Sequence, residues 1–472
     1  MNNDSSTTRL VALLRSELSR LQPGERLPST RRLVDTHKVS PITVTRALAA
    51  LGAEGLVVTR PGTGTFVAQS PARMTMSDHS WQTIVLGDRA VDTEYLAPLL
   101  DPLYDDSLIS LGTGYLHPSL LPTKALGTAM ARAARLSDAW DRPPVLGLRP
   151  LRSWFAQSAG PGIDLRDVLI TSGGQGAITT ILRALVPAGE PILVESPTYP
   201  GALAVAHSAG IRPVPVPTDG EGVIPEHLSH AFARTGARAF YVQPTYQNPT
   251  GAVLSTERRG QVLRAAAEAG AFVIEDDFAR WLSHGSRTPP PLLADDSDGR
   301  VVYITSLTKV ASGSLRIGAV IARGPVAERI HSLRLVDDMF VPRPTQEATL
   351  ELVSRAGWDR HIHDLSEALT RRSEVLAGAL HTHVPAVSLG SRPLGGLHLW
   401  VRLPLGFNDA EVAMAARRAG VVVIAGRPFF PAEAPAPYLR LTFSSAPTEL
   451  DLEAGVRRLA AAVPGLTEGS SD

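Results

Sequence analysis

Apolar side chains recur at helical spacing near the start of the chain. In residues 7–21 they stand at positions 10, 11, 13, 14, 18 and 21, which places them on one face of a helix. Prolines and a glycine then interrupt the pattern, and residues 29–38 and 41–55 predict a second and a third helix. Two β-rich runs around a Pro-Gly-Thr-Gly turn follow in residues 56–68 and predict a hairpin.

Three short helices and a β-hairpin within about 70 residues describe a winged helix-turn-helix. Ser29 is placed to cap the second helix and Ser40 to cap the third. Pro41 stands at the first position of the third helix, where a missing N–H costs nothing. The alternative is a small helical cap domain with a solvated face. The polar face of the third helix offers side chains suited to a DNA major groove: Thr43, Thr45 and Arg46.

Further along, buried-strand patterns alternate with helical ones. Residues 69–80 are polar and read as a linker. Apolar residues return beyond position 81, and we expect this segment to pack on the next domain. The alternation of strand and helix patterns begins near residue 107. Strands without internal polar alternation, separated by helices, predict a parallel sheet covered on both faces. The predicted organisation is therefore a winged helix-turn-helix at 1–70, a linker and packing segment at 71–106, and an α/β domain at 107–465.

Charge and composition narrow the functional classes. The 46 basic and 46 acidic residues cancel, yet residues 1–68 hold nine Lys or Arg against five Asp or Glu, an excess of +4 that suggests a polyanionic partner for this end. The chain has no cysteine, which excludes disulfides and cysteine nucleophiles, and no metal site is expected. No segment approaches the ~20 apolar residues of a membrane span, and the start lacks a signal-peptide pattern, so no membrane partner and a cytoplasmic location are expected.

A lysine follows one of the predicted strands. The chain has three lysines, Lys38, Lys124 and Lys309, among 46 basic residues, so 46 − 3 leaves 43 arginines. A lysine can lose its proton and condense with an aldehyde, which an arginine cannot do. Lys309 is therefore a candidate for covalent chemistry, with a surface lysine as the alternative.

Other polar motifs stand at the ends of the neighbouring strands. Glycines before a helix at Gly174–Gln175 can bind phosphate through free N–H groups, and Arg316 offers a fork for phosphate oxygens. The run "VIEDD" ends a strand with Asp276 and Asp277, where a carboxylate would pair with a buried cation such as a pyridinium nitrogen; two exposed acids are the alternative. An amide on a tight turn (Asn248) and an aromatic ring (Tyr199) complete the set, which together describes a pyridoxal phosphate site.

Two stretches resemble known families. Residues 24–68, with "LPS-R" and "GTGTFVA", resemble the GntR-type winged helix of bacterial repressors, and most of residues 107–465 resembles the fold-type-I aminotransferases. Together they resemble the MocR/GabR-like regulators. The resemblance implies a large parallel-sheet domain with a small C-terminal α/β subdomain, a homodimer, an operator in double-stranded DNA, and an effector that is an amine, an amino acid or pyridoxal phosphate itself.

The resemblance also implies residue roles. Lys309 forms the aldimine with the cofactor, Ser306, Arg316 and the Gly174–Gln175 turn hold its phosphate, and Asp276 pairs with its ring nitrogen. The remaining implied roles are a donor to the ring oxygen, a ring stacked on the cofactor and a grip on the effector carboxylate: Asn248, Tyr199 and Arg440. The implied DNA contacts are those of Arg31, Ser40 and the residues after it, and of the wing near Thr63 in the minor groove.

The chain departs from these families at three positions. Pro41 stands where an arginine often follows the serine, so a phosphate or base contact is missing there. Phe278 stands where a tyrosine hydroxyl usually meets the ring oxygen, which implies an altered aldimine pKa. Arg142 stands where a tyrosine usually reaches the partner's phosphate, and either it substitutes for that tyrosine or the loop differs.

Three functions stay open at this point. The first is a regulator that senses pyridoxal phosphate, an amine or an amino acid, without turnover as its task. The second is an active aminotransferase with an accessory DNA-binding module, and the third is a DNA-binding protein whose large domain is a dimerisation scaffold without cofactor.

Overall fold

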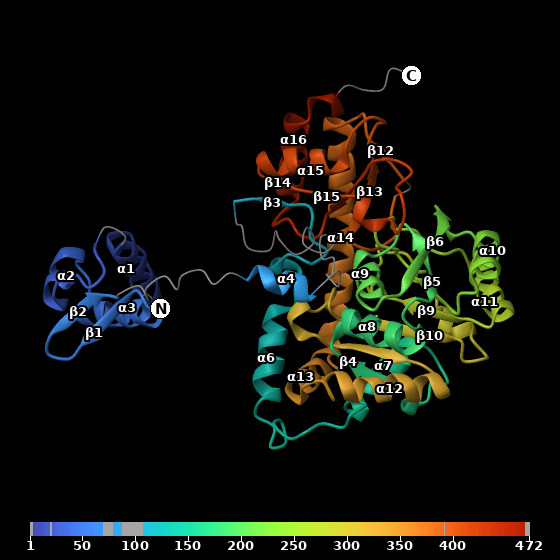
Figure 1. The fold of residues 1–472 in the computed structure, drawn as a ribbon, viewed down its shortest axis with the longest axis horizontal. Helices are drawn as coiled ribbons and strands as arrows, with labels where there is room; N and C mark the ends of the chain where they lie inside the picture. Colours follow the sequence, from blue (N-terminus) through green and yellow to red (C-terminus); the bar gives the residue numbers. More distant parts are fainter. Residues whose placement is uncertain (1–2, 19–20, 69–78, 87–106, 391, 468–472) are drawn as a thin grey trace. The chain divides into compact units, whose positions relative to one another are not determined.

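The computed structural model describes residues 3–18, 21–68, 79–86, 107–390 and 392–467. The chain divides into two compact units, Met1–Ala90 and Val91–Asp472 (Figure 1). The boundaries predicted near residues 70 and 106 lie outside the described residues, so they stay predictions.

The first unit has the predicted three helices and hairpin. They are α1 (Asn3–Leu18), α2 (Thr30–His37), α3 (Pro41–Ala53), β1 (Val57–Arg60) and β2 (Gly64–Val67), and the two strands pair antiparallel. Apolar side chains from the helices and the first strand form its core: Leu10, Leu14, Leu33, Val44, Leu51 and Val57. The hydrophobic spacing therefore predicted these elements correctly, with α1 beginning and ending a few residues early.

Serine side chains begin the second and third helices, as predicted for both. The Ser29 hydroxyl accepts a hydrogen bond from the Arg32 N–H at 3.3 Å, and the Ser40 hydroxyl accepts one from the Thr43 N–H at 3.2 Å. Each bond satisfies a donor that the first helical turn would otherwise leave free.

A short helix, α4 (Ser80–Leu86), lies in the segment expected to pack on the following domain. Its apolar side chains are exposed: Trp81, Ile84, Val85 and Leu86. The packing of residues 81–106 on the following domain stays a prediction, because α4 belongs to the first unit and residues 87–106 lie outside the described part.

The second unit is built on an eight-stranded sheet. In spatial order its strands are β4 (Val168–Thr171), β11 (Gly318–Ile321), β10 (Val301–Ser306), β9 (Phe272–Asp276), β8 (Ala239–Val242), β5 (Pro191–Ser196), β6 (Arg212–Asp219) and β7 (Gly222–Val223). The predicted parallel sheet is confirmed over β10, β9, β8, β5 and β6. Two strands depart from it, because β11 pairs antiparallel with β10 and β4, and β7 pairs antiparallel with β6. The chain reaches β11 directly from the loop after β10, without the crossover helix that a parallel neighbour needs.

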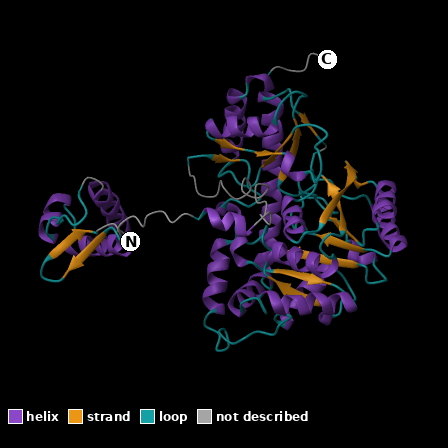
Figure 2. Cartoon of the chain, in the orientation of Figure 1, coloured by secondary structure: helices purple, strands orange, loops and turns teal. Residues whose placement is uncertain are grey.

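Both faces of this sheet are covered (Figure 2). Along β8, Phe240 and Val242 belong to one apolar core, whereas Ala239 and Tyr241 belong to another. Because successive strand side chains point to opposite faces, the two cores lie on opposite sides of the sheet. The helices of this unit that follow the strands or flank them are α6 (Thr123–Ala133), α7 (Arg149–Ala159), α8 (Gly173–Leu185), α9 (Pro200–Ser208), α10 (Pro225–Thr235), α11 (Thr256–Ala269), α12 (Pro325–Asp337) and α13 (Arg343–Val353).

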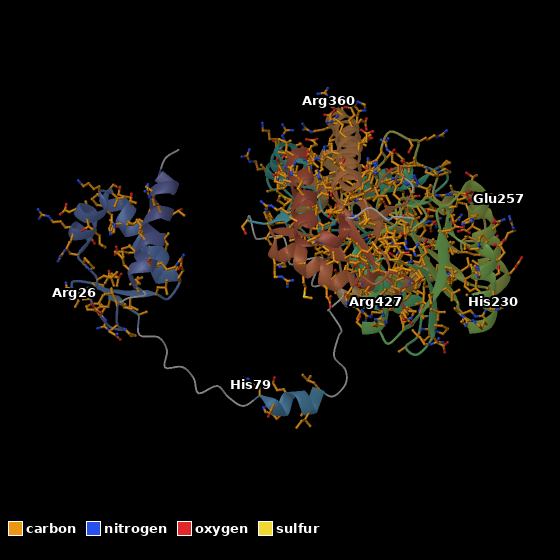
Figure 3. The ribbon with its side chains drawn as sticks, turned by 90° about the horizontal axis from the view of Figure 1, so that it is seen from above. Arg26, His79, His230, Glu257, Arg360 and Arg427 are labelled. Carbon is orange, nitrogen blue, oxygen red and sulfur yellow. The ribbon has the colours of Figure 1, made fainter. Side chains whose placement is uncertain are left out.

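Charged side chains mark the outer side of these helices. His230 on α10 and Glu257 on α11 are exposed and point outward (Figure 3), while Leu228 and Phe232 of α10 are buried. None of the described helices is long and apolar enough to cross a membrane.

The predicted small C-terminal α/β subdomain is present. Its antiparallel sheet has the order β12 (Ser388–Leu389), β13 (His398–Arg402), β16 (Tyr438–Thr442) and β15 (Ile424–Ala425), and β14 (Val421–Val422) pairs in parallel with β3 (Ile109–Ser110). Three helices accompany these strands: α14 (Ala356–His383), α15 (Asp409–Arg418) and α16 (Glu449–Ala462).

Candidate functional site

A cavity of about 280 Å³ lies at the carboxyl ends of the strands β8, β9 and β10. Parallel strands end at one edge of a sheet, and ligands of such sheets bind there. Every cofactor and effector residue predicted from the sequence lines this cavity: Gly174, Gln175, Tyr199, Asn248, Asp276, Ser306, Lys309, Arg316 and Arg440. The structure therefore brings the predicted set together from segments more than 260 residues apart in the chain, while the role of each stays a prediction.

Lys309 lies partly buried in the wall of this cavity, just after β10. Its Nζ lies 3.8 Å from the centre of the Tyr115 ring. Burial, helped by the positive charges of Arg440 and Arg316, lowers the pKa of the lysine to about 7, although Asp276 opposes this. Near neutral pH a large fraction of the amine is therefore unprotonated, which is the form that attacks a carbonyl carbon.

Asp276 ends β9 and faces the same cavity. Its Oδ2 accepts hydrogen bonds from the Tyr241 hydroxyl at 2.6 Å and from the Gln243 side-chain amide at 2.8 Å. Burial raises the pKa of this carboxyl to about 6, against the opposite effect of the two hydrogen bonds. At neutral pH the group is mostly ionised, held in place, and placed to pair with a buried cation.

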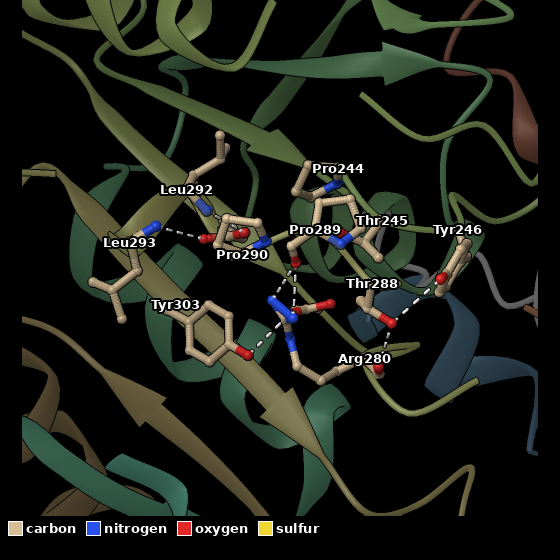
Figure 4. Close-up of polar contacts among 12 residues, drawn as sticks. Pro244, Thr245, Tyr246, Arg280, Thr288, Pro289, Pro290, Leu292, Leu293 and Tyr303 are labelled. Carbon is tan, nitrogen blue, oxygen red and sulfur yellow. Dashed lines mark hydrogen bonds and ion pairs between the residues drawn. The ribbon is translucent and has the colours of Figure 1, made fainter. Parts of the chain in front are cut away.

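The neighbouring acids Glu275 and Asp277 point to the opposite face of β9. Glu275 accepts hydrogen bonds from the backbone of Leu292 and Leu293, at 2.8 and 3.0 Å (Figure 4). Asp277 forms an ion pair with Arg280 and accepts a hydrogen bond from the Tyr303 hydroxyl at 2.9 Å. Asp277 is thus used inside the protein, and of the two acids predicted at this strand end Asp276 is the one available to a ligand.

The glycine turn at the start of α8 forms one end of the cavity. Gly173 has φ +81°, and a Cβ there would lie 3.2 Å from the guanidinium of Arg316, so this approach requires glycine. Arg316 donates to the Ser172 carbonyl at 2.7 Å. The hydroxyl of Thr308 is buried without a hydrogen-bond partner among the described residues. Free N–H groups of a helix start, a guanidinium and an unpartnered hydroxyl fit a phosphate group.

Arg440 and Asn248 lie together elsewhere in the cavity wall. Arg440 donates to the Asn248 side-chain carbonyl at 3.2 Å and to the Gly112 carbonyl at 2.5 Å, and its Nε has no partner in the described part of the chain. Burial lowers the pKa of Arg440 to about 9, which leaves it charged at neutral pH. Because its carbonyl is occupied, Asn248 has its NH₂ group left to donate to a ligand oxygen.

Tyr199 completes the predicted set. Its hydroxyl donates to the Gln175 side chain at 3.0 Å, which ties the aromatic ring to the glycine turn. Unpartnered buried polar atoms are rare in folded proteins, yet three of those found in the described residues line this one cavity, on Thr308, His398 and Arg440. The donor set and these unused atoms fit pyridoxal phosphate.

Several residues of the cavity were not predicted. Thr308 precedes Lys309 in the strand-end motif "SLTK", and Gln243 stands at the end of the predicted strand "ARAFYVQP", so the sequence positions of both residues carried a usable signal. Tyr115 and His398 come from segments without a recognisable pattern and reach the cavity only through the fold. Phe278 lines the cavity without a hydroxyl, as its sequence position indicated, whereas Arg142 is exposed and does not line it.

The first unit presents part of the predicted DNA-contacting set. The exposed members are Arg31, Ser40, Thr45, Arg46 and Thr63. The prediction for Thr43 is wrong, because this residue is only 5% exposed and its hydroxyl lies 2.8 Å from that of Ser40 inside the helix cap. Ile42, which the sequence pattern did not single out, is exposed at the start of α3.

Comparison with known proteins supports both parts of the chain. Residues 115–459 match the family model "Aminotransferase class I and II", and residues 7–67 match "Bacterial regulatory proteins, gntR family". The HTH-type transcriptional regulator YdfD of Bacillus subtilis is 27% identical over 442 residues, with 92% of this chain and 91% of the relative covered. The HTH-type transcriptional regulator TauR of Rhodobacter capsulatus is 30% identical over 450 residues, covering 90% of each chain.

The solved structures match the larger part of the chain. LysN, an α-aminoadipate aminotransferase from Thermus thermophilus complexed with N-(5'-phosphopyridoxyl)-L-leucine, aligns with a TM-score of 0.76 and 28% identity. The alignment covers 82% of this chain and 98% of that one. The aminotransferase fold is thus nearly complete in this chain, which also has the GntR-like segment.

Proposed function

This chain belongs to the regulators that join a GntR-family domain to an aminotransferase class I and II domain, which is the MocR-like architecture, and we propose a function from that premise. The proposed function is control of transcription in response to an amine or amino acid. It is a DNA-binding transcription regulator with a domain of the family that binds pyridoxal phosphate. The observation that carries the proposed response is Lys309, whose pKa is lowered to about 7, in one cavity with Asp276 and Arg440 in a chain that also has a winged helix.

The residues of the cavity divide between the groups of the cofactor. Lys309 would hold the aldehyde carbon and Asp276 the ring nitrogen. The Gly174–Gln175 turn, Ser306 and Arg316 would hold the phosphate, Asn248 would donate to the ring oxygen, and Tyr199 would cover the ring. When bound, pyridoxal phosphate supplies an aldehyde that reacts with primary amines and a ring that withdraws electrons.

The protein's own groups prepare the site for an amine. Burial favours the neutral form of Lys309, so its amine could accept the proton that an incoming ammonium group must lose before that group reacts. Arg440 keeps its charge, and its Nε has no hydrogen-bond partner among the described residues, which suits binding of the carboxylate of an amino acid. Hydrogen bonds from Tyr241 and Gln243 hold the Asp276 carboxylate in place, so the orientation of this carboxylate does not depend on a ligand.

The regulator is proposed to act as a cytoplasmic homodimer that binds operator DNA. The exposed, basic face of α2 and α3 supports the DNA contact, through Arg31 and Arg46. Apolar side chains are exposed around the end of α12, at Val336 and Met339, and Ser172 donates to the adjacent Asp338 at 3.3 Å. A partner subunit on this surface would cover apolar area next to the glycine turn and add groups to the site.

Absorbance of the purified protein tests the proposal. We expect a visible band in the unchanged protein and no such band in Lys309→Ala, while both bind DNA from upstream of the protein's own gene. Arg46→Ala should weaken this DNA binding and leave the band unchanged. A band that persists in Lys309→Ala would contradict the assignment of the lysine.

An active aminotransferase is the second candidate. The cavity unites Lys309, Asp276 and Arg440, and the aminotransferase LysN shares the fold. Repeated conversion of an amino acid and a keto acid by the purified protein would favour this candidate. Binding of the same amino acid without turnover, together with altered DNA affinity, would favour the regulator.

A further inference from the structure

His398 is a buried residue of the cavity to which the cofactor assigns no task. It begins β13, and only 6% of its surface is exposed. Its Nδ1 has no hydrogen-bond partner among the described residues. A buried polar atom without a partner destabilises a fold, so such an atom in a binding cavity points to a ligand that bonds it.

The imidazole and the Lys309 amine both lie close to one backbone position, Gly114. A Cβ built on Gly114 would be 3.6 Å from Cε1 of His398 and 3.7 Å from Nζ of Lys309. The phosphate, ring nitrogen and ring oxygen of the cofactor already have partners in Arg316, Asp276 and Asn248. His398 is therefore left for the second ligand, the amine that reacts next to Lys309.

The charges of the cavity limit what this ligand's side chain can be. The lining residues include the cations Lys309, Arg316 and Arg440 and one acid, Asp276. Burial, and then the charges of Arg440 and Lys309, hold the pKa of His398 well below its usual range, so the ring is neutral. A cationic side chain would be repelled in this cavity.

A neutral imidazole can donate through one nitrogen and accept through the other. His398 also lines a neighbouring cavity of about 580 Å³, together with Thr250 and Trp400, which provides room for a side chain of several atoms. We propose that His398 hydrogen-bonds the side chain of an amino-acid effector and selects an uncharged hydroxyl or carboxamide group there. This assignment rests on the proposed function.

Pairs of amino acids with the same shape test the selection. L-threonine with L-valine, and L-asparagine with L-leucine, differ mainly in hydrogen-bonding capacity, and L-lysine and L-glutamate add the two charges. In calorimetric titrations of the full-length protein with its cofactor, the unchanged protein should bind one polar member at least about tenfold tighter than its apolar partner. The His398→Phe variant should reduce that ratio to about one.

The control variant is His331→Phe, which makes the same exchange at a partly buried histidine of α12 outside both cavities. It should keep the ratio of the unchanged protein, and His398→Phe should keep the visible absorbance of the cofactor. The assignment is overturned if the ratio of polar to apolar affinity is the same in the unchanged protein and in His398→Phe. It is also overturned if an apolar or charged amino acid binds tightest, if no amino acid of the set binds, or if His398→Phe loses the cofactor absorbance. Failure of the proposed function would instead be a lack of cofactor absorbance or of DNA binding in the unchanged protein.

Discussion

Replacing Lys309 by methionine should change how the stability of the cofactor-free protein depends on pH. Methionine keeps most of the length of the side chain and removes the amine. In the folded chain the pKa of Lys309 falls from 10.5 to about 7, mainly because of burial. Between these two values the unfolded chain binds a proton at this position that the folded chain does not, so the free energy of unfolding rises with pH.

The magnitude follows from the size of this change. One pKa unit corresponds to about 1.4 kcal/mol, so the lysine adds a slope of at most about 1.4 kcal/mol per pH unit. From about pH 7.5 to about pH 9 the wild-type protein should gain about 2 kcal/mol relative to Lys309→Met. At neutral pH the methionine variant should be the more stable of the two, because it buries no amine.

Urea denaturation followed by tryptophan fluorescence measures this difference. Five of the six tryptophans, all but Trp81, belong to the second unit, so the signal reports the unit that contains Lys309. Both proteins are compared at one concentration, since an oligomer's stability depends on it. Parallel stability curves for the two proteins would refute the reasoning, because they would show that the folded state does not suppress protonation of this amine.

Three further changes test other parts of the structure. Ser40→Ala should lower the stability of the first unit by about 1 kcal/mol, because the Thr43 N–H loses its cap, and faster hydrogen exchange at the start of α3 would show it. Asp276→Asn should weaken binding of pyridoxal phosphate at least about tenfold. Asp277→Asn should mainly lower the melting temperature, because it leaves the Arg280 guanidinium without its counter-charge. Equal effects of the two changes on cofactor binding would contradict the assignment of Asp276. Gly173→Ala should weaken binding of inorganic phosphate, since the added methyl group meets Arg316 and strains the backbone, and unchanged affinity would count against the phosphate cup.

Local patterns in the sequence predicted the elements of both units well. The helix caps at Ser29 and Ser40 and the hairpin at 57–67 depend on neighbouring residues, and these interactions act over a few positions. The direction of β11 was not predictable in the same way, because "GAVI" is apolar whether it pairs parallel or antiparallel. Pairing direction depends on the path of the chain between strands, which hydrophobicity does not encode.

The sequence predicted those cavity residues that combine a reactive or charged side chain with a position at the end of a strand. Asp276 ends one buried strand and Lys309 follows another, and parallel strands bring their carboxyl ends together. The sequence could not show whether Asp276 or Asp277 faces the ligand, because this depends on the orientation of the strand. The positions of His398 and Tyr115 in the cavity could not be predicted either, because they depend on the whole fold. Thr43 shows the opposite error, since a polar side chain at a helix start can serve the helix rather than a partner.

The central claim is that an amine bound at Lys309 changes the affinity of the protein for DNA. The most direct measurement is a titration of DNA from upstream of the protein's own gene, with and without the amino acid that binds tightest to the cofactor-loaded protein. We predict a shift in apparent Kd for the unchanged protein and no shift for Lys309→Ala. The same shift in both proteins, or DNA binding that ignores the amino acid in both, would contradict the account.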